Sequence, residues 1–243
     1  MRIRVRVYIL RLFQPSGTSY GITLPMNLEA IQTALTPHGL IVRGGFRPEP
    51  SDVVPGNPAT MVIIGNAGSA MWRAFQAVRG DGPDPLDAWT RGVISGVAEK
   101  LGAAALFPFD GPPYMPFQKW AMRSEAVFGS PIGPLIHPVY GLWHGYRGAL
   151  AFEERIELPE RLPAASPCES CVDRPCLSSC PVGALSVGNY DVPACVDHIG
   201  SAAGSDCLER ACVARRACPV GREYHQEPAQ AAFHMKHFLA SNG

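Results

Sequence analysis

Apolar residues recur at helical spacing in two stretches of the first two-thirds of the chain. The first is 28–35, which follows the N-cap residue type Asn27 and precedes a Pro-His-Gly sequence that would end the helix. The second is 85–101, with Asp84 placed as the N-cap and a proline at the first helical position. Gly102 would close it. The pattern therefore predicts one short and one long helix.

Short apolar runs between these stretches predict strands. They lie at 40–42, 61–64, 103–107 and 146–156. At the N-terminus, arginines alternate with Ile and Val over 2–7, as expected for a half-exposed strand. Since helices and strands alternate along the chain, the pattern predicts a layered α+β or α/β fold.

Charge and composition exclude some classes of function. Lys and Arg together number 21, and Asp and Glu number 21, so no global basic charge favours a nucleic acid partner. Nowhere does an apolar run approach the ~18–20 residues of a membrane span. The N-terminal apolar run 7–10 is too short for a signal peptide, and we expect a cytoplasmic protein. Cytoplasmic thiols stay reduced, which directs cysteine clusters towards metal binding or catalysis.

All eight cysteines lie between positions 168 and 218, and this asymmetry predicts two domains. A proline-rich segment, 158–167, separates them as a linker. We therefore expect an α+β domain over 1–160 and a small cysteine-rich module over 161–243. The spacing of Ala and Phe over 226–239 predicts a final helix that packs on this module.

The first four cysteines have a spacing close to that of bacterial ferredoxins. They form the run Cys168-x2-Cys171-x4-Cys176-x3-Cys180-Pro, compared with the ferredoxin run C-x2-C-x2-C-x3-C-P. Three thiolates of one tight loop can hold three corners of an iron–sulfur cube, while the fourth cysteine ligates the second cube. The two extra residues before Cys176 would bulge outward.

The last four cysteines are spaced more widely, but they end in a repeat of the same motif. Cys-Pro-Val-Gly occurs at 180–183 and again at 218–221. The crossed ligation of two-cluster ferredoxins then implies two [4Fe–4S] clusters. The first would be held by Cys168, Cys171, Cys176 and Cys218, and the second by Cys180, Cys195, Cys207 and Cys212. Two alternatives also use all eight thiols: a pair of tetrahedral zinc sites and a set of four disulfides.

The segment His137-Pro-Val-Tyr140-Gly-Leu-Trp143-His-Gly-Tyr-Arg147-Gly fits the pattern HPxxGxWxxxRG. This pattern resembles that of CblC-type cobalamin-processing proteins, and the cysteine module is similar to that of epoxyqueuosine reductases and reductive dehalogenases. The resemblance implies a nitroreductase-like domain that binds a corrinoid, followed by a ferredoxin-like module. It makes His137, Tyr140, Trp143 and Arg147 candidates for contact with the corrinoid, although a histidine before proline and aromatics at this spacing are also typical of a domain core.

These observations predict an iron–sulfur oxidoreductase that passes single electrons through two clusters to a corrinoid. Reduced ferredoxin or flavodoxin would be the electron donor. The alternative is a ferredoxin-type electron-transfer protein whose N-terminal domain binds no corrinoid and serves in partner docking or cobalamin trafficking.

Overall fold

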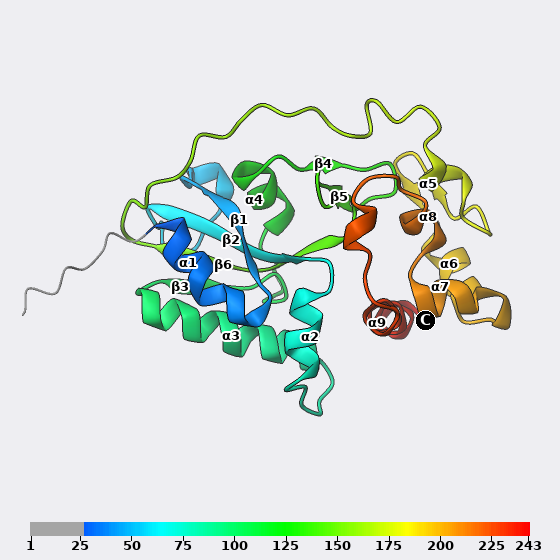
Figure 1. Ribbon diagram of the computed structural model, residues 1–243, viewed down its shortest axis with the longest axis horizontal. Helices are drawn as coiled ribbons and strands as arrows, with labels where there is room; N and C mark the ends of the chain where they lie inside the picture. Colours follow the sequence, from blue (N-terminus) through cyan, green and yellow to red (C-terminus); the bar gives the residue numbers. More distant parts are fainter. Residues whose placement is uncertain (1–26) are drawn as a thin grey trace, which may run out of the picture.

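The structure, a computed structural model, describes residues 27–243, so the strand expected at 2–7 lies outside the described residues. The N-terminal part contains a four-stranded antiparallel sheet (Figure 1). In order across the sheet, its strands are β1 (Ile41–Phe46), β2 (Thr60–Ala67), β6 (His144–Phe152) and β3 (Ala104–Leu106). The four other expected strands are therefore confirmed, with ends that differ by a few residues.

Helices cover both faces of this sheet. They are α1 (Leu28–Leu35), α2 (Ala70–Gln76), α3 (Pro85–Leu101) and α4 (Phe117–Ser124). Successive side chains of a strand point to opposite faces, and the apolar run 61–64 of β2 follows this rule. Val62 and Ile64 pack with residues of α1, α2 and α3, whereas Met61 and Ile63 pack with residues of α4. The α+β prediction is confirmed, and the sheet is the centre of a layered core.

The two predicted helices are present for the expected reasons. At the start of α1, the Asn27 side chain accepts a hydrogen bond from the Ala30 amide at 2.9 Å. Gly102 ends α3 in the left-handed conformation, with φ of 66°. Asp84 differs from the expectation, because its side chain makes no capping hydrogen bond although the helix begins at the next residue.

The cysteine-rich part consists of short elements joined by loops. They are α5 (Pro175–Ser178), β7 (Leu185–Ser186), β8 (Asn189–Tyr190), α6 (Val192–Ile199), α7 (Ser205–Arg210) and α8 (Val213–Arg216), followed by α9 (Pro228–Asn242). Helix α9 confirms the predicted final helix and packs against α6 and α7. It also lies beside α2 of the N-terminal part (Figure 1). There the Phe233 ring lies 5.2 Å from that of Trp72.

A second contact between the two parts is formed by a small hairpin and the loop after it. The hairpin strands are β4 (Phe128–Gly129) and β5 (Leu135–Ile136). Ile132, Ile136 and Leu142 share an apolar cluster with Leu185 and Ala214 of the cysteine-rich part. Buried packing thus crosses the expected boundary at residue 160, and the division into 1–160 and 161–243 stays a prediction about the chain.

Two glycines make this contact close. Both have positive φ, 57° at Gly141 and 72° at Gly221. A Cβ atom on Gly141 would lie 2.0 Å from the Val220 carbonyl oxygen, and one on Gly221 would lie 2.4 Å from the carbonyl carbon of Tyr140. The backbones on either side therefore approach at a distance that only glycine permits.

Candidate iron–sulfur centre

The eight thiols of the cysteine-rich part gather into two groups. The first thiol group consists of Cys168, Cys171, Cys176 and Cys218. Burial raises the pKa of Cys168 and of Cys176, and in both cases the nearby thiols of Cys218 and Cys171 raise that pKa further. Cys218 lies 42 residues or more from its partners in sequence (218 − 176 = 42), and the chain returns through α8 to place it there.

The second thiol group consists of Cys180, Cys195, Cys207 and Cys212. Burial raises the pKa of Cys195, and the neighbouring thiols of Cys180 and Cys207 add to this effect. The pKa of Cys212 is raised by burial and by Cys195 and Cys180. Helices α6 and α7 carry Cys195 and Cys207, while Cys212 precedes α8. Crossed ligation of the two groups stays a prediction.

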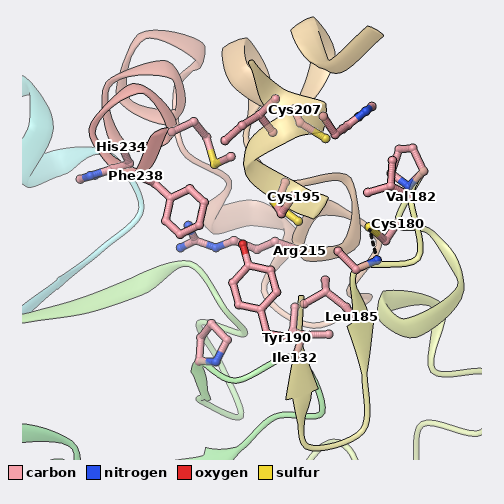
Figure 2. A pocket seen from close by; sticks show the side chains of 17 residues that line it. Ile132, Cys180, Val182, Leu185, Tyr190, Cys195, Cys207, Arg215, His234 and Phe238 are labelled. Carbon is pink, nitrogen blue, oxygen red and sulfur yellow. Dashed lines mark hydrogen bonds between the residues drawn. The ribbon is translucent and has the colours of Figure 1, made fainter. Parts of the chain in front are cut away.

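All four thiols of the second group line one cavity of about 300 Å³ (Figure 2). Its remaining wall is largely apolar and includes Ile132, Leu185 and Phe238. Tyr190 and Arg215 are polar groups that face the same cavity (Figure 2). A largely apolar cavity lined by four cysteines suits a metal–sulfur group, because such a site holds the thiolates and limits their contact with water.

Hydrogen-bond donors surround the sulfurs of the second group. The Ala184 amide donates to the Cys180 sulfur at 3.3 Å. Cys212 accepts from the backbone amides of α8, and the Tyr190 hydroxyl donates to the Cys195 sulfur. Donors of this kind stabilise negative charge on sulfur and raise the potential of a bound cluster.

A single metal ion and a cubane need different spacing of the thiols. Tetrahedral zinc, with Zn–S bonds of ~2.3 Å, would hold its four sulfurs about 3.8 Å apart. A cubane holds them further apart, because four irons lie between them. In the part of the chain that the structure describes, no three side chains of His, Cys, Asp or Glu are close enough to hold one metal ion. The assignment of these cysteines as metal ligands stays a prediction. The two thiol groups are the sets of side chains that would hold the metal.

The four candidates of the N-terminal part lie in different surroundings. His137 stacks on Tyr140 with ring centroids 4.4 Å apart, and its Nδ1 accepts from the Val139 amide at 3.0 Å. Burial lowers the pKa of His137 to about 4, and Arg43 contributes to the shift. The Tyr140 ring also contacts the Arg43 guanidinium at 4.9 Å. These two residues therefore take part in contacts within the fold.

Trp143 and Arg147 are separated from that pair. Trp143 is 1% exposed and packs under the guanidinium of Arg215, 4.5 Å from its ring centroid. Arg147 lines a different cavity of about 180 Å³, where it lies 4.0 Å from Asp87. Its Nε donates a long bond of 3.4 Å to the Asn66 side chain. Within residues 27–243, the four candidates do not converge on one cavity, and their assignment to a corrinoid stays a prediction.

Three residues of the site were not expected from the sequence. Arg215 and Tyr190 face the second thiol group, and His234 lines both its cavity and the Arg147 cavity. Burial, followed by the charge of Arg147, lowers the pKa of His234 to about 3. No local sequence pattern pointed to any of these three residues.

None of the helices in the described range is long and apolar enough to cross a membrane. No family model matches the chain, and no curated protein matches it. Solved structures do match. An epoxyqueuosine reductase has a TM-score of 0.50 and 16% sequence identity, with 84% of this chain and 69% of that chain covered. A reductive dehalogenase, described with B12-dependent dehalogenation, has a TM-score of 0.50 and 13% identity, with 93% and 38% covered.

A second epoxyqueuosine reductase structure, solved with a tRNA-Tyr stem loop, has a TM-score of 0.48 and 16% identity, with 84% of this chain and 67% of that chain covered. At these identities the likeness concerns the fold. The chain spans about two-thirds of the epoxyqueuosine reductases and 38% of the dehalogenase. The fold of this chain is thus similar to that of the two enzyme groups that its cysteine module indicated.

Proposed function

We propose that this protein is an iron–sulfur oxidoreductase that holds two [4Fe–4S] clusters and transfers single electrons. The observation that carries this proposal is the arrangement of eight thiols in two groups of four, each crossing between two segments of the chain. Clusters bound there would supply one-electron chemistry at low potential. The thiolates would hold the clusters, and the groups around them would set the reduction potential.

Each part of the second site has a role in this proposal. Its four thiolates would hold the iron, and the apolar wall would exclude water and oxygen. The amide and hydroxyl donors to sulfur would offset the negative charge that an electron adds. The first thiol group, whose Cys218 belongs to the loop in contact with Gly141, would place the other cluster beside the N-terminal part.

The test is metal analysis of protein purified without oxygen, with matched pairs of cysteine variants. Wild-type protein should be brown and contain about eight irons with acid-labile sulfide, whereas a zinc protein would be colourless. Under crossed ligation, Cys168→Ser with Cys218→Ser removes one cluster and leaves about four irons. Cys168→Ser with Cys180→Ser removes both clusters. If the Cys168/Cys180 variant instead keeps about four irons and the Cys168/Cys218 variant loses both clusters, ligation is uncrossed. Zinc or no metal in the wild type would refute the proposal.

A corrinoid as electron acceptor is a second candidate. It is supported by the fold likeness to a dehalogenase described with B12 and by the motif at 137–148. The cavity beside Arg147, at about 180 Å³, is smaller than the pockets of ~300–1,000 Å³ that suit drug-sized ligands. The cavity beside Arg147 thus does not by itself have the size of a corrinoid site, and we derive no step through that cofactor.

Incubation with hydroxocobalamin followed by desalting tests this second candidate. A corrinoid site should retain the red chromophore, and Arg147→Ala should reduce the retention. Arg73→Ala is the control, since Arg73 is exposed and pairs with Glu227. Absence of retention by wild-type protein would favour the alternative, an electron-transfer protein whose N-terminal domain docks a partner or serves in cobalamin trafficking. Reduced ferredoxin and flavodoxin, as proposed donors, can be compared by anaerobic bleaching of the cluster absorbance.

A further inference from the structure

Arg215 connects the second thiol group with the N-terminal part. Its Nε and Nη2 atoms both donate to the Leu142 carbonyl oxygen, at 3.0 and 2.6 Å. The guanidinium lies over the Trp143 ring, and the same side chain lines the cavity of the second thiol group (Figure 2). The backbone amide of Arg215 also donates to the Cys212 sulfur. The cation is thereby fixed in position beside the four thiols.

Among residues 27–243, no Asp or Glu forms an ion pair with Arg215. Its neighbour Arg216 differs, because it forms an ion pair with Asp206. Arg210 on α7 also pairs with Asp206. A cation held against an apolar wall without a counter-charge is unfavourable, since burial removes the water that would solvate it. The site therefore favours an anionic occupant.

We propose that Arg215 is the counter-charge of the second cluster and raises its reduction potential above that of a site without it. This inference rests on the proposed function, because it requires a cluster on the second thiol group. One electron from a reduced ferredoxin or flavodoxin, or from dithionite in the assay, makes the cluster and its thiolates one charge more negative. Arg215 stabilises this reduced state more than the oxidised state, because attraction grows with the charge. No proton is needed, and Arg215 acts as a positioning and electrostatic residue.

The experiment is a potentiometric titration followed by EPR on the full chain, purified without oxygen. Arg215→Met removes the charge and keeps a long side chain, whereas Arg215→Lys keeps the charge and loses the fork of donors to Leu142. Arg210→Met is the control, since Arg210 is exposed and pairs with Asp206. We expect the potential of one cluster to become more negative in Arg215→Met, and to remain near the wild-type value in Arg215→Lys and Arg210→Met.

An unchanged potential in Arg215→Met would overturn the inference, and so would an equal shift in Arg215→Lys. If Arg215→Met loses the second cluster, the iron content of Arg215→Lys decides. About eight irons in that variant would support the role of charge, while about four would show that packing or hydrogen bonds matter instead. Failure of the proposed function looks different, because wild-type protein would then contain no iron to titrate.

Discussion

The repeated Cys-Pro-Val-Gly motif provides a matched pair of substitutions that tests how the cysteine-rich part is docked. Gly183 and Gly221 end the two copies, with φ of 61° and 72°. Alanine at either position must adopt the left-handed conformation, which costs roughly 1–2 kcal/mol. This cost is common to both variants. Any difference between Gly221→Ala and Gly183→Ala must therefore come from their surroundings.

The two glycines differ in the space around them. No atom lies within 4 Å of a Cβ built on Gly183, whereas a Cβ on Gly221 would lie 2.4 Å from the carbonyl carbon and oxygen of Tyr140. Ordinary contact begins at 3.4 Å, so one backbone must move by about 1 Å (3.4 − 2.4 = 1.0). Overpacking of this kind costs about 1–3 kcal/mol. Gly221→Ala should be less stable than Gly183→Ala by that amount.

Thermal unfolding under nitrogen, followed by far-UV circular dichroism, measures the difference. For a chain of this size, a loss of about 1 kcal/mol in the free energy of unfolding lowers Tm by about 2–4 °C. Gly221→Ala should therefore melt roughly 2–12 °C below Gly183→Ala. It should also lose iron faster from the site of Cys218, three residues away. Equal melting temperatures, or a lower value for Gly183→Ala, would refute the close backbone contact between the two parts.

Three further predictions concern single side chains. Arg43→Met should destabilise the fold by about 3–5 kcal/mol in guanidinium unfolding, because it leaves the partly buried Glu125 carboxylate, 14% exposed, without the buried cation 2.7 Å away. Tyr190→Phe removes the hydroxyl donor to the Cys195 sulfur and should lower one cluster potential by roughly 20–65 mV in an EPR titration, for a hydrogen bond of about 0.5–1.5 kcal/mol. Burial lowers the pKa of His144 to about 3, so between about pH 6.5 and 5 only the unfolded chain binds a proton at this histidine, and the folded state loses stability as the pH falls. His144→Gln should make this loss smaller in urea unfolding. An unchanged pH dependence would contradict this.

Local sequence patterns were sufficient to predict much of the N-terminal fold. Helices α1 and α3 have clear boundaries, at Asn27 and at Pro85 with Gly102, and the apolar run in β2 is buried on both faces of the sheet. Helix α4 was missed. It has only eight residues and follows Pro116, and its burial depends on packing of Trp120 against the sheet.

For the thiols, the spacing and the repeated Cys-Pro-Val-Gly motif led to a prediction of crossed ligation, by likeness to two-cluster ferredoxins, and this stays a prediction. The position of Arg215 could not be predicted. It depends on how α8 meets the loop that ends at Leu142, and no local pattern specifies a contact between segments 73 residues apart. The same holds for His234, which lies between two cavities only because α9 packs between the two parts of the chain.

The motif at 137–148 has a structural role in this chain that bears on the corrinoid question. Gly141 permits the close approach of the Cys218 loop, and Trp143 packs under Arg215, so both residues maintain the docking of the cysteine-rich part. Loss of a corrinoid in a Trp143 variant could then follow from a displaced module. Arg147 is different, because its guanidinium lines a separate cavity and makes one long hydrogen bond. A substitution at Arg147 leaves the Gly141 and Trp143 contacts in place, which makes Arg147→Ala the variant whose cobalamin retention best distinguishes a cofactor site from a motif that serves the fold.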